Sequence, residues 1–122
     1  MTLARFTPTK VRAAKRPLPP RLGRDRTITI FRILQEALTN ITRHAHASHV
    51  EITLSSDDEK TQLIVSDNGI GMRTDYAPDV DSLGIMSMCE RASALGGRVN
   101  INNGNNGGTI VTLEIPVKYH QP

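Results

Sequence analysis

Residues 27–48 read TITIFRILQEALTNITRHAHAS and decide the fold of this chain. Apolar residues recur in this stretch at steps of three and four, which is the period of one face of an α-helix. Neither Gly nor Pro interrupts it, and Thr27 or Thr29 could cap its first turn. The pattern predicts an amphipathic helix with a buried stripe of Phe31, Leu34, Leu38, Ile41 and Ala45.

The same helix carries a regular polar edge. Glu36, Asn40 and His44 are four residues apart, so their side chains stack one turn above another. A carboxylate, a carboxamide and an imidazole in that arrangement could form a metal or catalytic site. They could also form the solvated edge of an amphipathic helix, which is the commoner arrangement. The rest of the chain has to decide between the two.

Length and composition limit the class of protein. The 122 residues are enough for one domain with a single core. The only cysteine, Cys89, excludes an internal disulfide, so nothing indicates an oxidising compartment. No apolar run approaches the roughly 20 residues that a membrane-spanning helix needs, and there is no signal-peptide segment. We therefore expect a cytoplasmic domain, whose parent protein could itself be membrane-anchored.

The net charge of +3 is divided unevenly along the chain. Residues 1–26 carry eight Lys/Arg and one acid, whereas residues 27–122 carry seven Lys/Arg and eleven acids. The first 26 residues also contain four prolines and show no helix or strand period. We expect a flexible lead-in there, a domain at 27–118 and a short tail at 119–122. A basic tail could bind nucleic acid or an anionic membrane, but it lacks an amphipathic face and a recognisable motif, so we expect neither contact.

After the first helix, the sequence alternates between strands and one further helix. Period-two alternation predicts a half-buried strand at 49–56, and short apolar runs predict further strands at 62–66, 99–101 and 110–115. The polar segment at 73–82 has little to bury and is expected to be mobile. A second helix is predicted by the helical spacing of Ile85, Met88, Cys89, Ala92 and Leu95, with Gly96-Gly97 as its end. This order predicts a two-layer α/β sandwich, with a mixed, mostly antiparallel sheet and helices on one face.

Three glycine-containing segments could approach a ligand. In Asp67-Asn68-Gly69-Ile70-Gly71, an aspartate leaves a strand and is followed by two glycines that allow close backbone approach to a flat ligand. In Ser82-Leu83-Gly84, a glycine at a helix start could leave N–H groups free to face an anion. Gly107-Gly108-Thr109 opens the last strand. Taken singly, the first and third of these segments could equally be plain turns.

Four motifs in this order resemble the ATP-binding domain shared by sensor histidine kinases, DNA gyrase, mismatch-repair MutL and the heat-shock chaperones, the GHKL or HATPase superfamily. They are FRILQEALTNITRHAHAS (31–48), DNGIGM (67–72), SLGIMSMCERASALGG (82–97) and GGTIVTLEIP (107–116). Their wording is most similar to the kinases that signal to helix-turn-helix response regulators. The resemblance implies the Bergerat ATP-binding fold and the catalytic domain of a two-component histidine kinase.

The resemblance also implies roles at the phosphate end of the site. Asn40 would supply an oxygen to Mg²⁺, a hard cation that prefers oxygen ligands. Glu36, one turn earlier, would be the base or polarising group for the phosphate acceptor. Arg43 and His44, one turn later, would donate to phosphate oxygens.

At the adenine end, Asp67 would accept the adenine amino hydrogen, and Gly69 and Gly71 would let the backbone approach the ring. Thr109 would support Asp67 through its hydroxyl or a water. Residues 73–83 would form a lid that closes over the phosphates, with Gly84 at its hinge. Mg-ATP would then donate its γ-phosphate mainly through positioning and charge neutralisation.

Two features depart from the family pattern. Ser82 stands where the second glycine box usually begins with glycine, which gives the lid backbone less freedom. The helical dimerisation region that carries the phospho-accepting histidine in these kinases is replaced here by the lead-in. We therefore expect the catalytic domain alone, itself monomeric. Its partners would be the phospho-accepting dimerisation domain of the parent kinase and a downstream response regulator.

Two other functions are compatible with the same fold. A stand-alone serine kinase of the anti-sigma-factor type would phosphorylate a partner protein without a dimerisation helix, but the motif wording favours the sensor kinases. A non-catalytic module could hold ATP without transfer, but the presence of both Glu36 and Asn40 argues against it. We expect no zinc at His44, His46 and His49, because the first two point to different sides of a helix and no cysteine joins them.

Overall fold

The described part of the chain forms two helices and five strands. The structure is a computed structural model that describes residues 10–12, 23–41, 49–69, 80–104 and 107–117. In chain order the elements are β1 (Lys10–Arg12), α1 (Arg24–Asn40), β2 (Val50–Ser56), β3 (Lys60–Asp67), α2 (Val80–Ser93), β4 (Arg98–Asn103) and β5 (Thr109–Pro116). Both predicted helices and all four predicted strands are present, with somewhat different ends.

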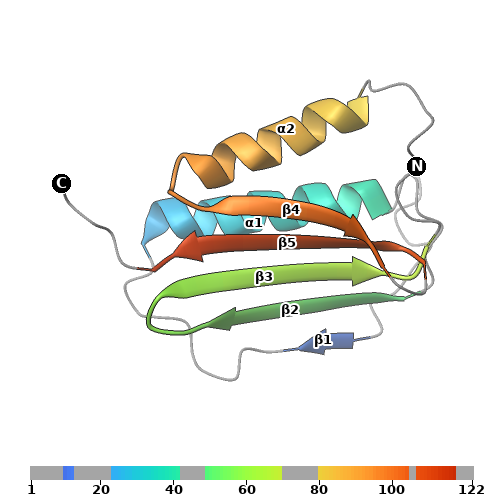
Figure 1. Ribbon diagram of the computed structural model, residues 1–122, viewed down its shortest axis with the longest axis horizontal. Helices are drawn as coiled ribbons and strands as arrows, with labels where there is room; N and C mark the ends of the chain where they lie inside the picture. The colour runs from blue at the N-terminus through green and yellow to red at the C-terminus, as the bar shows by residue number, and fades with distance from the viewer. Residues whose placement is uncertain (1–9, 13–22, 42–48, 70–79, 105–106, 118–122) are drawn as a thin grey trace.

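The five strands form one sheet in the order β1-β2-β3-β5-β4. The pairs β2–β3, β3–β5 and β4–β5 are antiparallel, and only β1 joins the sheet in parallel, alongside β2. α1 packs against β3 and β5, α2 packs against β4 and β5, and the two helices lie side by side (Figure 1). The fold is therefore the predicted two-layer α/β sandwich with a mixed, mostly antiparallel sheet.

A single hydrophobic core lies between the helix layer and the sheet. Side chains along β3 alternate between buried and half-buried, so Leu63 and Val65 point towards the helices. They pack in one cluster with Ile33 of α1, Met88 of α2 and Leu113 of β5. Because both helices contribute to the same cluster, they cover the same face of the sheet.

The buried stripe of α1 differs from the predicted one. Its most buried apolar residues are Ile30, Ile33, Ala37 and Ile41, whereas Phe31 has 56% of its surface exposed. Leu34 and Leu38 are only partly buried, at the border of the core. Steps of three and four fit both stripes equally well, and only the position of the sheet selects the isoleucine stripe. The predicted role of Phe31 is therefore wrong, and Ala45 lies outside the described residues.

α1 also begins earlier than predicted. Gly23, with φ +94°, precedes the first turn and makes no side-chain cap, so neither Thr27 nor Thr29 is the N-cap. The Thr27 hydroxyl instead donates to the Gly23 carbonyl oxygen at 2.8 Å, and Thr29 is buried. The Arg26 Nε donates to the Pro116 carbonyl oxygen at 2.8 Å, which fixes this turn beside the end of β5.

One regular element lies where the sequence showed no period. β1 is a three-residue strand within the expected lead-in, and it pairs with Glu51, Ile52 and Thr53 of β2. It is too short for a periodicity to be recognised. None of the described helices is long and apolar enough to cross a membrane.

The C-terminal end of α2 is closed as predicted by Gly96 and Gly97. The Gly96 N–H donates to the Ser93 carbonyl and the Gly97 N–H donates to the Ala92 carbonyl, both at 2.9 Å. With Gly96 at φ +77°, this pair of bonds is a Schellman motif. The other end of α2 differs from the prediction, because the helix begins at Val80 and Gly84 lies in its second turn.

Candidate functional site

Four chain segments that carry predicted site residues meet at one end of the sandwich. The last turn of α1, the end of β3, the start of β5 and the first turn of α2 all lie on the right in Figure 1. Asn40 is the last residue of α1, Asp67 is the last residue of β3 and Thr109 is the first residue of β5. Residues that are far apart in the sequence are thus brought to a common edge.

Asp67 is a buried carboxylate held by two backbone amides. Its side chain is 7% exposed, and the strand alternation directs it towards the helix layer. Its Oδ1 accepts the Gly69 N–H at 2.8 Å, and its carboxylate also accepts the Thr109 backbone N–H. Burial raises the pKa of Asp67 above its ordinary value, and the two amide hydrogen bonds oppose that rise. The result is a fixed acceptor in a low-dielectric environment.

The glycines before β5 are required by this arrangement. Gly107 and Gly108 have φ of +93° and +81°, a region that other residues rarely adopt. A Cβ at Gly108 would collide with the Asp67 carbonyl oxygen, and one at Gly107 would lie 3.4 Å from the Gly69 carbonyl oxygen. The pair therefore lets the start of β5 close over the Asp67 turn. The structure joins Thr109 to Asp67 through its backbone amide, and a role for its hydroxyl stays a prediction.

A contact that the sequence did not reveal anchors the same turn from the other side. Asn68 accepts the His49 N–H on its Oδ1 at 2.9 Å, and its own N–H donates to the His49 carbonyl at 3.3 Å. The Asn68 Nδ2 also lies 3.5 Å from His49 Nδ1. Because Val50 pairs with Asp67 in the β2–β3 hairpin, His49 and Asn68 lie opposite each other. The register of this hairpin is therefore the feature from which their contact could be predicted.

Glu36 and Gly84 lie in direct contact. Glu36 is half-buried on α1, and a Cβ at Gly84 would overlap its carboxylate. Glu36 has no hydrogen bond or ion pair with any other described residue. The lack of a side chain at Gly84 thus makes room for a carboxylate that its described neighbours leave unpaired.

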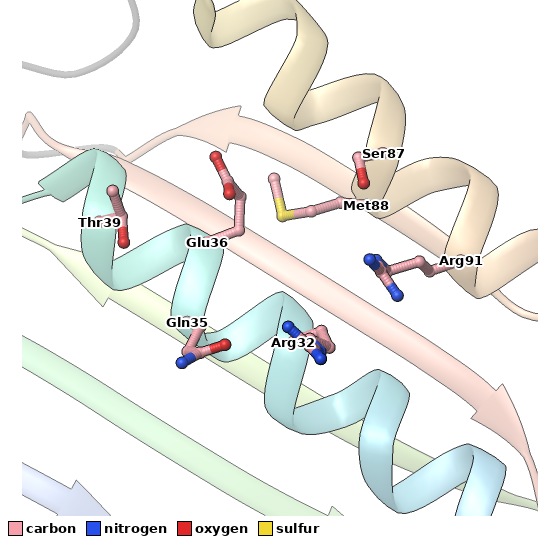
Figure 2. Close-up of a pocket in the computed structure, with 7 residues that line it drawn as sticks. All are labelled: Arg32, Gln35, Glu36, Thr39, Ser87, Met88 and Arg91. Atoms are coloured by element: carbon pink, nitrogen blue, oxygen red, sulfur yellow. The ribbon is translucent and has the colours of Figure 1, made fainter.

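The Glu36 carboxylate lines a pocket of about 330 Å³ between the two helices (Figure 2). α1 contributes Arg32, Gln35, Glu36 and Thr39 to its walls, and α2 contributes Ser87 and Arg91. Figure 2 shows the Glu36 side chain directed across the space towards α2. We name this pocket the α1–α2 groove.

Asn40 is half-buried, one turn beyond Glu36 on the same helix. The following residue, Ile41, still donates its N–H to Ala37 and Leu38, so the helical geometry extends through Asn40. No group of three or more His, Cys, Asp or Glu side chains in the described ranges could hold a metal by itself. Mg²⁺ beside a nucleotide needs only one or two protein oxygens in addition to phosphates and water, and the carboxamide of Asn40 fits that requirement.

Several predicted positions cannot be placed. Arg43, His44, His46 and Gly71 lie outside the described residues, as does most of the predicted lid, at 73–79. Residues 80–83 belong to the first turn of α2, ahead of Gly84. The predicted lid and its hinge stay predictions.

Asp67 and Glu36 thus lie towards the same end of an α/β sandwich, the first as a buried acceptor and the second without a partner among the described residues. The family described as histidine kinase-, DNA gyrase B- and HSP90-like ATPases matches residues 25–119. The chain belongs to this family, and it is an ATP-binding domain of the kind found in two-component sensor histidine kinases.

Individual relatives agree with this assignment. The chain is 40% identical to the oxygen sensor histidine kinase NreB of Staphylococcus carnosus over 88 residues, which is 72% of this chain and 25% of NreB. It is 36% identical to the nitrate/nitrite sensor protein NarX of Escherichia coli over 103 residues, which is 83% of this chain and 17% of NarX. The chain thus spans a quarter or less of the length of these relatives.

Solved structures show the same fold. The histidine kinase domain of the Erythrobacter litoralis EL346 blue-light activated histidine kinase superposes with a TM-score of 0.68 at 25% identity, over 93% of this chain and 52% of that one. The Acinetobacter baumannii histidine kinase AdeS superposes with a TM-score of 0.73 at 22% identity, over 95% of this chain and 56% of that one. The second likeness concerns the fold alone.

Proposed function

We propose that this chain is the catalytic part of a two-component histidine kinase, which binds Mg-ATP and transfers the γ-phosphate to a histidine on a separate dimerisation domain. The observation that carries the proposal is that Glu36 and Asn40 lie one above the other on the same face of α1. One turn apart on α1, they lie at the edge where Asp67 closes β3, and Glu36 faces an open groove with no described partner.

In this proposal Asp67 selects the base. A buried carboxylate that already accepts two backbone N–H groups presents its remaining lone pairs as acceptors only. It would therefore accept a hydrogen from the amino group of adenine. Gly69 and the Gly107-Gly108 turn leave the backbone beside it without side chains, and Gly71 would do the same.

Glu36 and Asn40 serve the other end of the nucleotide. Asn40 would hold Mg²⁺ through its carboxamide oxygen, and the ion would neutralise charge on the phosphates. Glu36 would take the proton from the acceptor imidazole as its nitrogen bonds to the γ-phosphorus and the bond from that phosphorus to the bridging oxygen of ADP breaks. Arg43 and His44 would donate to phosphate oxygens, and residues 73–83 would close over them.

The sensor kinases named above as relatives also suggest the partners. The acceptor would be the dimerisation domain of a parent kinase, the phosphoryl group would pass on to a response regulator, and the catalytic domain itself would be monomeric and cytoplasmic. No observation favours the serine kinase or the non-catalytic module over this assignment.

A two-variant experiment tests the proposal. Glu36→Gln should leave Mg-ATP affinity within about two-fold, because Glu36 acts on the acceptor, while transfer to an added dimerisation domain should fall at least about 100-fold. Asn40→Ala should weaken Mg-ATP binding and transfer together. Normal transfer by Glu36→Gln would show that Glu36 is not the base. A chain that binds no ATP would refute the function as a whole.

A further inference from the structure

The α1–α2 groove carries more positive charge than its single carboxylate can neutralise. Arg32 comes from α1 and Arg91 from α2, and Figure 2 shows both side chains at the same end of the groove, with the Arg91 guanidinium directed towards α1. Both side chains are exposed, and neither makes an ion pair or a hydrogen bond with another described residue. These two present their donors to whatever enters the groove.

The other groove residues suit a polar ligand as well. Ser87 and Thr39 offer hydroxyl groups and Gln35 offers an amide, so donors face the space from both helices. At the inner wall, Met88 is almost fully buried and joins the groove to the hydrophobic core. The groove therefore has a well-packed inner wall at Met88 and a polar, positively charged rim that favours anions.

The positions of the charges along the groove are also informative. Arg32 lies four residues before Glu36, just over one helical turn, which corresponds to a rise of about 6 Å along α1. Arg91 lies two turns beyond Gly84 on α2, and the two helices run in opposite directions. Both arginines are thus displaced from Glu36 towards the same end of the groove, away from the nucleotide edge.

We propose that the α1–α2 groove is the docking surface for the phospho-accepting partner, and that Arg32 and Arg91 bind acidic side chains of that partner. The inference rests on the proposed function, because an acceptor imidazole that gives its proton to Glu36 must enter this groove. Charge complementarity then indicates which residues of the partner flank its acceptor histidine. A carboxylate about one helical turn from the acceptor histidine meets the two guanidinium groups.

A pair of peptides tests this specificity without requiring catalysis. Both peptides are short helices with one histidine, and they differ only in carrying glutamate or glutamine one turn on either side of it. Each is titrated into the isotope-labelled 122-residue chain, and the shifts of the backbone amides map the contact and give Kd. The glutamate peptide should shift amides of α1 and α2 that border the groove and should bind at least about five-fold more tightly than the glutamine peptide.

Matched variants complete the test. Arg32→Gln and Arg91→Gln should each weaken the glutamate peptide about five-fold, and raised salt should have a similar effect. Arg98→Gln removes the same charge from β4, where Arg98 pairs with Glu114 at 3.2 Å and is 73% exposed, and it should leave Kd unchanged. Equal binding of both peptides, absence of binding, shifts outside the groove or insensitivity to both groove variants would each overturn the inference.

The outcome is separable from that of the proposed function. Suppose that the glutamate peptide binds in the groove but the chain transfers no phosphate to any dimerisation domain. The groove is then still a binding site for acidic peptides, but its role in docking an acceptor fails together with the proposed function. If transfer occurs and the double variant Arg32→Gln/Arg91→Gln has an unchanged KM for the acceptor domain, the groove inference fails alone.

Discussion

Replacing Asp67 by asparagine tests both the recognition of adenine and the pH dependence of stability. Asparagine keeps the size of the side chain but has one acceptor oxygen and one donating NH₂ group. If its oxygen continues to accept the Gly69 N–H at 2.8 Å, its NH₂ group faces either the Thr109 amide or the adenine amino group, donor against donor. A hydrogen bond to a charged acceptor contributes about 1.5–3 kcal/mol, so ATP affinity should fall about 10- to 100-fold or more.

The pH dependence of stability should also change in this variant. Burial raises the pKa of Asp67 above 3.8, so the folded state holds this proton more tightly than the unfolded state does. The free energy of unfolding of the wild-type chain therefore falls as pH rises from the ordinary pKa through the raised one, and ionised Asp67 continues to lower it at neutral pH. Asp67→Asn removes that dependence, so its free energy of unfolding should change less between about pH 4 and 8 than that of the wild type.

Two assays check this reasoning. Calorimetric titration with Mg-ATP measures the affinity, and thermal unfolding at pH values between about 4 and 8 measures the stability difference. Asp67→Ala serves as a control, because it leaves the Gly69 and Thr109 amides without an acceptor and should cost about 1–3 kcal/mol. Unchanged ATP affinity in Asp67→Asn would refute the assignment of the adenine site. An unchanged pH dependence of stability in this variant would refute the account of the buried carboxylate.

Four further substitutions test the packing around the site. Gly108→Ala combines a positive φ with a collision against the neighbouring strand, and should cost about 1–3 kcal/mol in thermal unfolding. Gly84→Ala would displace the Glu36 carboxylate, so phosphoryl transfer should fall at least about ten-fold, with a smaller change in the melting temperature. Ile33→Ala should cost about 2–5 kcal/mol in denaturant unfolding, whereas Phe31→Ala should cost within about 0.5 kcal/mol.

Each of these has a contrary result. Wild-type stability of the Gly108 variant would mean that the turn before β5 is not closed as described. Wild-type transfer by the Gly84 variant would show that the contact with Glu36 has no catalytic consequence. Equal losses in the free energy of unfolding for the Ile33 and Phe31 variants would support the buried face that the sequence predicted for α1.

Much of the fold could be predicted from the sequence, because apolar residues recur along its strands and its glycines mark the turns. The face of α1 could not, since the apolar residues are dense enough to form two overlapping stripes and only contact with β3 and β5 selects between them. The start of α1 was missed for a related reason. Gly23 precedes the helix without any side-chain cap, so the prediction of a threonine N-cap placed the start of the helix too late.

The site was predictable where a local motif determines it. Asp67 and its glycines form such a motif, and Glu36 and Asn40 are linked by helical spacing. The contacts between segments were not predictable: the Asn68–His49 pairing, the Thr109 amide on Asp67 and the approach of Gly84 to Glu36 all depend on how the sheet and helices pack. The arginines of the α1–α2 groove lie on two helices whose register is set only by the tertiary structure.

The central claim is that a buried carboxylate at the end of β3 reads the base of a nucleotide. The most direct test compares the affinity of the wild-type chain for ATP and for GTP in the presence of Mg²⁺, by calorimetric titration. Adenine presents an amino donor where guanine presents a carbonyl acceptor, and two acceptors facing each other in a buried site repel. We predict that ATP binds and that GTP binds roughly 100-fold more weakly. Equal affinities for the two nucleotides, or tighter binding of GTP, would contradict the account.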